Sequence, residues 1–121
     1  MRSSFCASSR PSQVKVWPPS PRRFVVVDAP IPGGFEIADP SLQGTPARVR
    51  EVSGGYATHR EIRPDRMVYF VDQLSAGVHR WSYVAKAMTA GEYVVPPTRA
   101  EEMYTPETYG RTAATTVRIA R

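Results

Sequence analysis

Short runs in which apolar and polar residues alternate, separated by proline and glycine turns, restrict the fold of this chain more than any other feature. The clearest run is 78–88, where Trp81 and Tyr83 share one face with alanines and the charged residues share the other. A period of two over this length predicts a half-buried strand. The two aromatic side chains are therefore interpreted as core residues, in preference to a platform for stacking a ligand.

Similar runs recur along the chain. Residues 66–72 are apolar on both faces, which is typical of a strand inside a sheet, and 56–63 alternate weakly, as an exposed edge strand would. About seven short strands without a long helical pattern predict an all-β fold, an antiparallel β-sandwich. The predicted strands lie near residues 24–27, 35–37, 56–63, 66–72, 78–88, 93–95 and 112–119. Glycines and prolines in 40–55 predict a long loop.

One segment carries helix signals. Thr98 and Glu101 have the spacing of a capping box, and Thr105 followed by Pro106 is a second helix start. We therefore expect one or two short helical turns near 98–109. Because such turns are too short to be stable alone, packing against the sandwich would have to hold them.

The net charge of +5 is concentrated at the beginning of the chain. Residues 1–23 contain five of the 16 Lys and Arg residues and no acid, so the other 11 basic residues are matched by 11 acidic ones. Prolines and serines are frequent in the same segment, which predicts a disordered basic leader over 1–23 and a folded domain over 24–121. A neutral domain argues against nucleic-acid binding.

Other functional classes find no support in the residue types present. No apolar run approaches the ~20 residues of a transmembrane helix, and residues 1–23 lack the apolar stretch of a signal peptide. Cys6 has no second cysteine to pair with. His59, Glu61 and His79 are too few for a structural zinc site. We therefore predict no metal, no cofactor and no enzymatic activity.

The segment 94–112 is unusual for a connection. It contains Met103, Tyr104 and Tyr109, where a purely structural loop would more often be polar. These side chains would either pack on the sandwich or form a contact with another domain. The residues alone leave both interpretations open.

Three blocks in order extend the interpretation: FVVVDAPIPGGFEIADP, REIRPDRMVYFVDQLSAG and WSYVAKAMTAGEYVVPPTRAEEMYTPETYGRT. Together they resemble the carboxy-terminal macroglobulin-like domain of the bacterial alpha-2-macroglobulin family over residues 24–121, with the leader outside the resemblance. Pro64 departs from the aspartate more common in the family, and Asp28 and Arg66 match positions that we interpret as structural.

The resemblance implies a role in protease inhibition. Members of the family are large periplasmic protease traps, in which a thioester formed within a Cys-x-Glu-Gln sequence captures the protease. This chain has no such sequence, no signal peptide and no lipobox. In the family the terminal domain packs on the thioester domain, and the tyrosine of a Met-Tyr-x-Pro loop shields the thioester from water. That role carries over to Tyr104, with Met103, Pro106 and Glu107 completing the match.

The resemblance thus implies a non-enzymatic domain whose partner is the thioester domain of a larger chain and, indirectly, proteases. The alternative is a free-standing fibronectin-like module whose 97–110 loop binds an unrelated protein or a carbohydrate.

Overall fold

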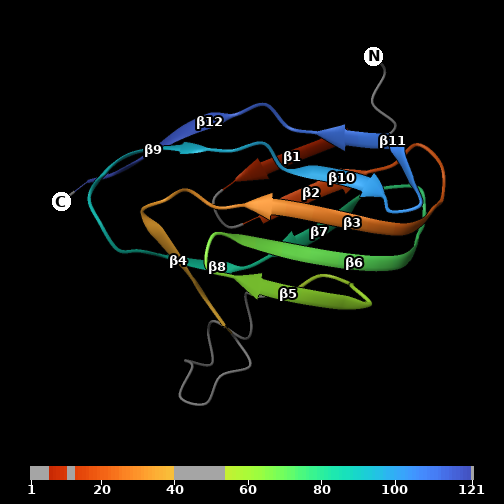
Figure 1. Cartoon of the computed structure of the whole chain (residues 1–121), viewed down its shortest axis with the longest axis horizontal. Helices are drawn as coiled ribbons and strands as arrows, with labels where there is room; N and C mark the ends of the chain where they lie inside the picture. Colours follow the sequence, from red (N-terminus) through yellow and green to blue (C-terminus); the bar gives the residue numbers. More distant parts are fainter. Residues whose placement is uncertain (1–5, 11–12, 40–53, 121) are drawn as a thin grey trace.

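A computed structural model describes residues 6–10, 13–39 and 54–120, and within them the chain forms twelve strands in antiparallel sheets (Figure 1). The largest sheet contains, in spatial order, β11 (Thr105–Arg111), β10 (Arg99–Glu102), β3 (Arg22–Pro30), β6 (Arg66–Leu74) and β5 (His59–Arg63). The described residues include no helix that could span a membrane. The prediction of an all-β fold of antiparallel strands is confirmed.

Three smaller sheets complete the domain. One contains β1 (Cys6–Arg10), β2 (Gln13–Trp17) and β7 (His79–Ser82), and it lies behind the five-stranded sheet in Figure 1. The other two are the pairs β9 (Gly91–Val95) with β12 (Thr115–Ile119) and β4 (Phe35–Ala38) with β8 (Val84–Ala87). Both pairs lie toward the end of the molecule where the chain terminates.

The core fills the space between the two larger sheets. The five-stranded sheet contributes inward residues of β3 and β6, and the three-stranded sheet contributes inward residues of β2 and β7. Tyr69 stacks on Trp81 across this interface, with 5.4 Å between ring centroids and 26° between planes. The predicted core positions Trp81 and Tyr83 are confirmed, because they are only 1% and 3% exposed.

The predicted disordered leader is wrong for residues 13–23. Residues 13–17 form β2, which pairs with β7 in the register Val14↔Trp81 and Val16↔His79. Both valines are fully buried, while Gln13, Lys15 and Trp17 are half-buried, so the segment alternates like any sandwich strand. The sequence prediction missed this strand because its period of two extends over only five residues and the segment around them is basic and rich in proline.

The predicted helical turns near 98–109 are also wrong, because this segment forms the hairpin of β10 and β11. Ala100 pairs with Val27 of β3 on one side and with Gly110 of β11 on the other, and it is completely buried. The Thr98 N–H, which would donate to the Glu101 side chain in a capping box, instead donates to Thr112 Oγ1 at 2.9 Å. β10 therefore forms a strand because it pairs with β3 on one edge and with β11 on the other. This pairing outweighs the local capping signals in a segment that is too short for a stable helix.

The predicted strand over 78–88 is divided in the structure. Its first half is β7, paired with β2, and its second half is β8, paired with β4. The chain changes sheet at Tyr83. The alternate residues of the predicted inward face are therefore buried as far as Tyr83, whereas Ala87 is exposed. The edge strand predicted for 56–63 is confirmed, because β5 lies at the edge of the five-stranded sheet. The interior strand predicted for 66–72 is also confirmed, because β6 lies between β3 and β5. Most of the predicted loop over 40–55 lies outside the described residues.

Candidate functional site

Two large apolar residues form the turn between β10 and β11. Met103 and Tyr104 join Glu102 to its ladder partner Thr105. Hairpin turns of this length usually contain glycine or asparagine, because their backbone angles disfavour bulky side chains. Tyr104 is nevertheless 79% exposed, and Met103 is 38% exposed. The fold therefore presents an aromatic and a thioether side chain to the surroundings without burying them in its own core.

The strand that follows the turn is irregular. Glu101 pairs with Tyr109, but Glu102 pairs with Thr105, so the register shifts between these two positions. Pro106 and Glu107 fall in the unmatched part of β11, where a residue without an N–H is tolerated. Glu107 is exposed. Thus Met103, Tyr104, Pro106 and Glu107, all four predicted site residues, lie at one end of this hairpin.

The turn is fastened to the beginning of β3 through Phe24. The Met103 N–H donates to the Phe24 carbonyl oxygen at 2.8 Å, one step beyond the last β10 to β3 ladder pair. The Phe24 and Tyr104 rings meet edge to face, with 5.3 Å between centroids and 82° between planes. Such T-shaped pairs are favourable because the positive edge of one ring meets the negative face of the other.

Phe24 has an uncommon backbone conformation. Its φ is +52°, and no other described residue apart from glycine has a positive φ. For a bulky residue this is a true outlier, with a cost of order 1–3 kcal/mol. Sequence reasoning missed Phe24, because a phenylalanine at the head of a β-branched run gives no sign of a left-handed backbone.

Charged contacts brace the rest of the hairpin. Arg22 and Glu102 approach to 3.8 Å, and both side chains are mostly buried at 23% and 19% exposure. Farther along, the Arg99 guanidinium lies 4.4 Å from the centre of the Tyr109 ring and pairs with Glu101 at 3.1 Å. Cation–π and ion-pair contacts of this kind restrict long side chains on a sheet face.

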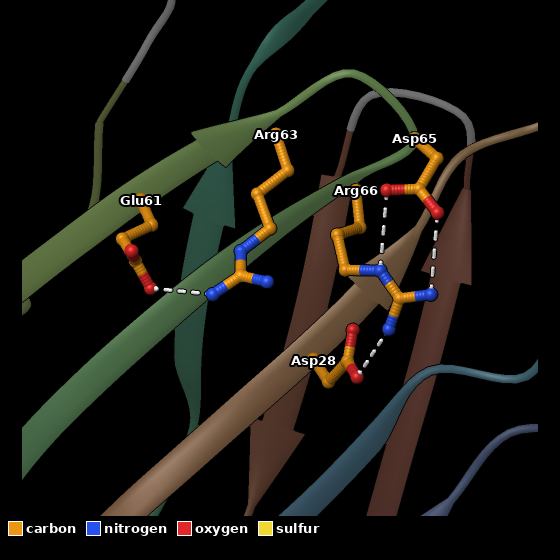
Figure 2. A network of polar contacts seen from close by, with 5 residues as sticks. All are labelled: Asp28, Glu61, Arg63, Asp65 and Arg66. Atoms are coloured by element: carbon orange, nitrogen blue, oxygen red, sulfur yellow. Dashed lines mark hydrogen bonds and ion pairs between the residues drawn. The ribbon is translucent and has the colours of Figure 1, made fainter.

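A second polar cluster lies on β3, β5 and β6 (Figure 2). Arg66 lies between two carboxylates: its Nη1 donates to Asp28 Oδ2 at 2.8 Å, and its Nε and Nη2 donate to the two oxygens of Asp65 at 3.3 Å. Arg63 donates to Glu61 along β5 at 3.3 Å. The network joins the β5 to β6 turn to β3. Its geometry agrees with the structural role expected for Asp28 and Arg66.

The same contacts shift two pKa values. The hydrogen bond from Arg66 lowers the pKa of Asp65 below its usual range, and the reciprocal bond raises the pKa of Arg66, aided by the charge of Asp28. Asp65 and Arg66 therefore keep their charges at neutral pH, which suits a tie between strands.

The histidines considered as metal ligands lie in different sheets. The His59 ring packs against Phe70 of the five-stranded sheet, whereas the His79 ring stacks near Trp81 and its Nε2 lies 2.7 Å from the Ser75 carbonyl oxygen. Across residues 6–10, 13–39 and 54–120, no three histidine, cysteine or carboxylate side chains gather as a metal site would require. The side chain of Cys6 lies outside what the structure describes.

Comparison with known proteins gives a consistent result. Residues 11–107 match the family described as the bacterial alpha-2-macroglobulin MG10 domain. The alpha-2-macroglobulin homolog of Nostoc is 32% identical over 94 residues, which is 77% of this chain and 5% of that protein. The match begins at residue 11, so the expectation that the whole of 1–23 lies outside the resemblance is wrong.

Solved structures agree with the fold. Trypsin-activated alpha-2-macroglobulin from Escherichia coli superposes with a TM-score of 0.74 at 24% identity, over 88% of this chain and 8% of that one. The Salmonella alpha-2-macroglobulin reacted with methylamine gives 0.66 at 21% identity, over 84% of this chain and 7% of that one. The chain thus spans less than a tenth of these relatives, and it belongs to the MG10 domain family of bacterial alpha-2-macroglobulins.

Proposed function

We propose that this chain works as the MG10 domain of a bacterial alpha-2-macroglobulin, a protease inhibitor, and that its Met103–Tyr104 turn packs on the thioester domain of the same large molecule. In this role the domain is a non-enzymatic part of a periplasmic protease trap. Its partner is the thioester domain, and proteases are met only through the assembly.

The observation that carries the proposal is the 79% exposure of Tyr104 on a well-fastened turn. A flexible loop would lose entropy when it docks, whereas this turn is already fixed by the Met103 N–H bond to the Phe24 carbonyl oxygen and by the Arg22–Glu102 pair. An exposed aromatic residue held in this way can cover a reactive group when the neighbouring domain is in place.

The chemistry of a thioester explains why a cover is needed. A small amine attacks the carbonyl carbon, forms an amide and releases the cysteine thiol, and water reacts in the corresponding way. A phenol ring that lies over the thioester carbonyl keeps water and small amines away from the carbonyl carbon. The acyl group is then desolvated and is protected from attack. The methylamine-reacted Salmonella relative supports a test with that amine.

The test uses a full-length bacterial alpha-2-macroglobulin in which this chain takes the place of the MG10 domain. Methylamine is added, and released thiol is followed with a chromogenic disulfide. Tyr104→Gly should release thiol severalfold faster than the parent, whereas Tyr104→Phe, which keeps the ring, should match the parent. Tyr56→Ala serves as a control, because Tyr56 is also largely exposed, at 67%, but lies outside this hairpin. An unchanged rate in Tyr104→Gly would refute the shielding role.

A further inference from the structure

We infer that Phe24 is a positioning residue for Tyr104, which holds the tyrosine ring in the orientation that it presents to the neighbouring domain. The inference rests on the proposed function and adds a second residue, from a distant part of the chain. Phe24 is the third residue of β3, and Tyr104 lies in the turn after β10.

Two contacts connect Phe24 to the turn, one to the backbone of Met103 and one to the ring of Tyr104. The Phe24 carbonyl oxygen accepts the Met103 N–H at 2.8 Å, which fixes the backbone of the turn immediately before Tyr104. The ring of Phe24 meets the ring of Tyr104 edge to face at 5.3 Å. One residue thus fixes the turn through its backbone and the tyrosine side chain through its ring.

An aromatic residue at position 24 has a backbone cost. At φ = +52° an aromatic residue is strained, and glycine would adopt this conformation without strain. Phe24 is also 42% exposed, and it is not part of the hydrophobic core cluster. The aromatic contact that the structure gives Phe24 is the one with Tyr104, and we take this contact as the reason for an aromatic side chain at a strained, half-exposed position. Strain of this kind typically gathers at sites of function.

The second contact restricts a side chain that would otherwise be free to turn. Tyr104 is 79% exposed, and an exposed ring samples several rotamers. An edge-to-face pair favours one of them by about two- to tenfold. We therefore expect Phe24 to keep the Tyr104 ring mostly in one orientation before the neighbouring domain docks, which lowers the entropy lost on docking.

The first experiment examines the 121-residue chain itself by NMR. The ring protons of Tyr104 should show shifts from the Phe24 ring current, and these shifts should disappear in Phe24→Leu and in Phe24→Gly. Phe24→Tyr, which keeps an aromatic ring, should retain them. Phe24→Gly also relieves the backbone strain, so its thermal midpoint should stay at or above that of the parent. The inference is overturned if Tyr104 keeps its shifts in both the leucine and the glycine variants, or if both variants fail to fold while Phe24→Tyr folds normally.

The second experiment measures methylamine reactivity in the full-length assembly described above. Phe24→Leu should release thiol about two- to tenfold faster than the parent. Combining Phe24→Leu with Tyr104→Gly should be no faster than Tyr104→Gly alone, because Phe24 acts only through the tyrosine. Additive rates would overturn the inference.

The two experiments separate the two ideas. If Tyr104→Gly does not change the methylamine rate but Phe24→Leu still shifts the Tyr104 resonances, the shielding function fails and the positioning contact stands. If Tyr104→Gly accelerates the reaction while Phe24→Leu changes neither the resonances nor the rate, shielding stands and the positioning role is refuted.

Discussion

Arg66 donates from Nη1 to Asp28 Oδ2 at 2.8 Å, and the two residues are 38 positions apart in the chain. The ion pair crosses from β6 to β3, and the Ile31 N–H reinforces it by donating to the Asp65 carbonyl oxygen at 2.9 Å. The turn after β5 is therefore fixed to the segment that leaves β3. These ties hold β3 at the end of the strand opposite to Phe24.

A double-mutant cycle should find a favourable coupling between Arg66 and Asp28. The two side chains are 35% and 38% exposed, so we expect a coupling free energy of about 0.5–1 kcal/mol, as is usual for partly exposed ion pairs. Urea unfolding of Arg66→Ala, Asp28→Ala and the double variant measures it. Glu61 and Arg63 provide the matched control, because they are 40% and 54% exposed, and their coupling should be near zero. Equal couplings for the two pairs would contradict this assignment.

Truncation of Val14 should destabilise the whole domain. Val14 is fully buried and lies opposite Trp81, so Val14→Ala should lower the free energy of unfolding by about 2 kcal/mol. Lys15→Ala is the control on the other face of β2, where Lys15 is half-buried and its Nζ lies 5.1 Å from the centre of the Trp17 ring, and it should cost under about 1 kcal/mol. If Val14→Ala unfolds like the parent, β2 is not part of the cooperative unit.

Comparison of β2 with β7 shows how much of the fold could be predicted from sequence. The large apolar residues Trp81 and Tyr83, at a clear period of two, predicted a strand with an inward face. Both side chains are buried in the structure. Val14 and Val16 have the same period, but lysine, prolines and serines surround them. The partner that buries the two valines is far away in the chain, so local composition predicted disorder where tertiary pairing produces a strand.

The candidate site was also predicted only in part from the sequence. Met103 and Tyr104 were identifiable because apolar residues are unexpected in a connection, and the structure places them in an exposed turn. The form of that connection was not identifiable, since helix-start signals at Thr98 and Thr105 are local and the pairing of β10 with β3 is not. The contact with Phe24 depends on a backbone angle that no residue pattern predicts.

The domain should lose stability as the solution becomes strongly alkaline. Burial raises the pKa of Tyr83 from 10.0 to about 12, and it also raises the pKa of Tyr69. Between pH 10 and 12 the unfolded chain has therefore released protons that the native protein still holds, so the free energy of unfolding falls with rising pH. The slope should reach about 1.4 kcal/mol per pH unit for each tyrosine.

Thermal unfolding followed by circular dichroism from pH 9 to 11.5 would measure this slope. Tyr83→Phe should make it shallower, since the variant has one buried phenol fewer. Tyr56→Phe is the control, because Tyr56 is largely exposed. A slope that is the same in Tyr83→Phe and in the parent would show that the alkaline instability has another origin.

Alanine substitutions at three glycines should distinguish the cost of a positive φ from the cost of a steric clash. Gly55 has φ = +115°, and a Cβ there would meet the Arg80 carbonyl oxygen at 2.6 Å, so Gly55→Ala should cost about 2–3 kcal/mol. Gly77 has φ = +108° but open space, so Gly77→Ala should cost only about 1 kcal/mol. Gly54 has open space and no positive φ, and Gly54→Ala should stabilise by about 0.5 kcal/mol because the unfolded chain loses entropy. Urea unfolding of the three variants tests this order. Equal costs at Gly55 and Gly77 would mean that the close approach of Gly55 to β7 contributes nothing.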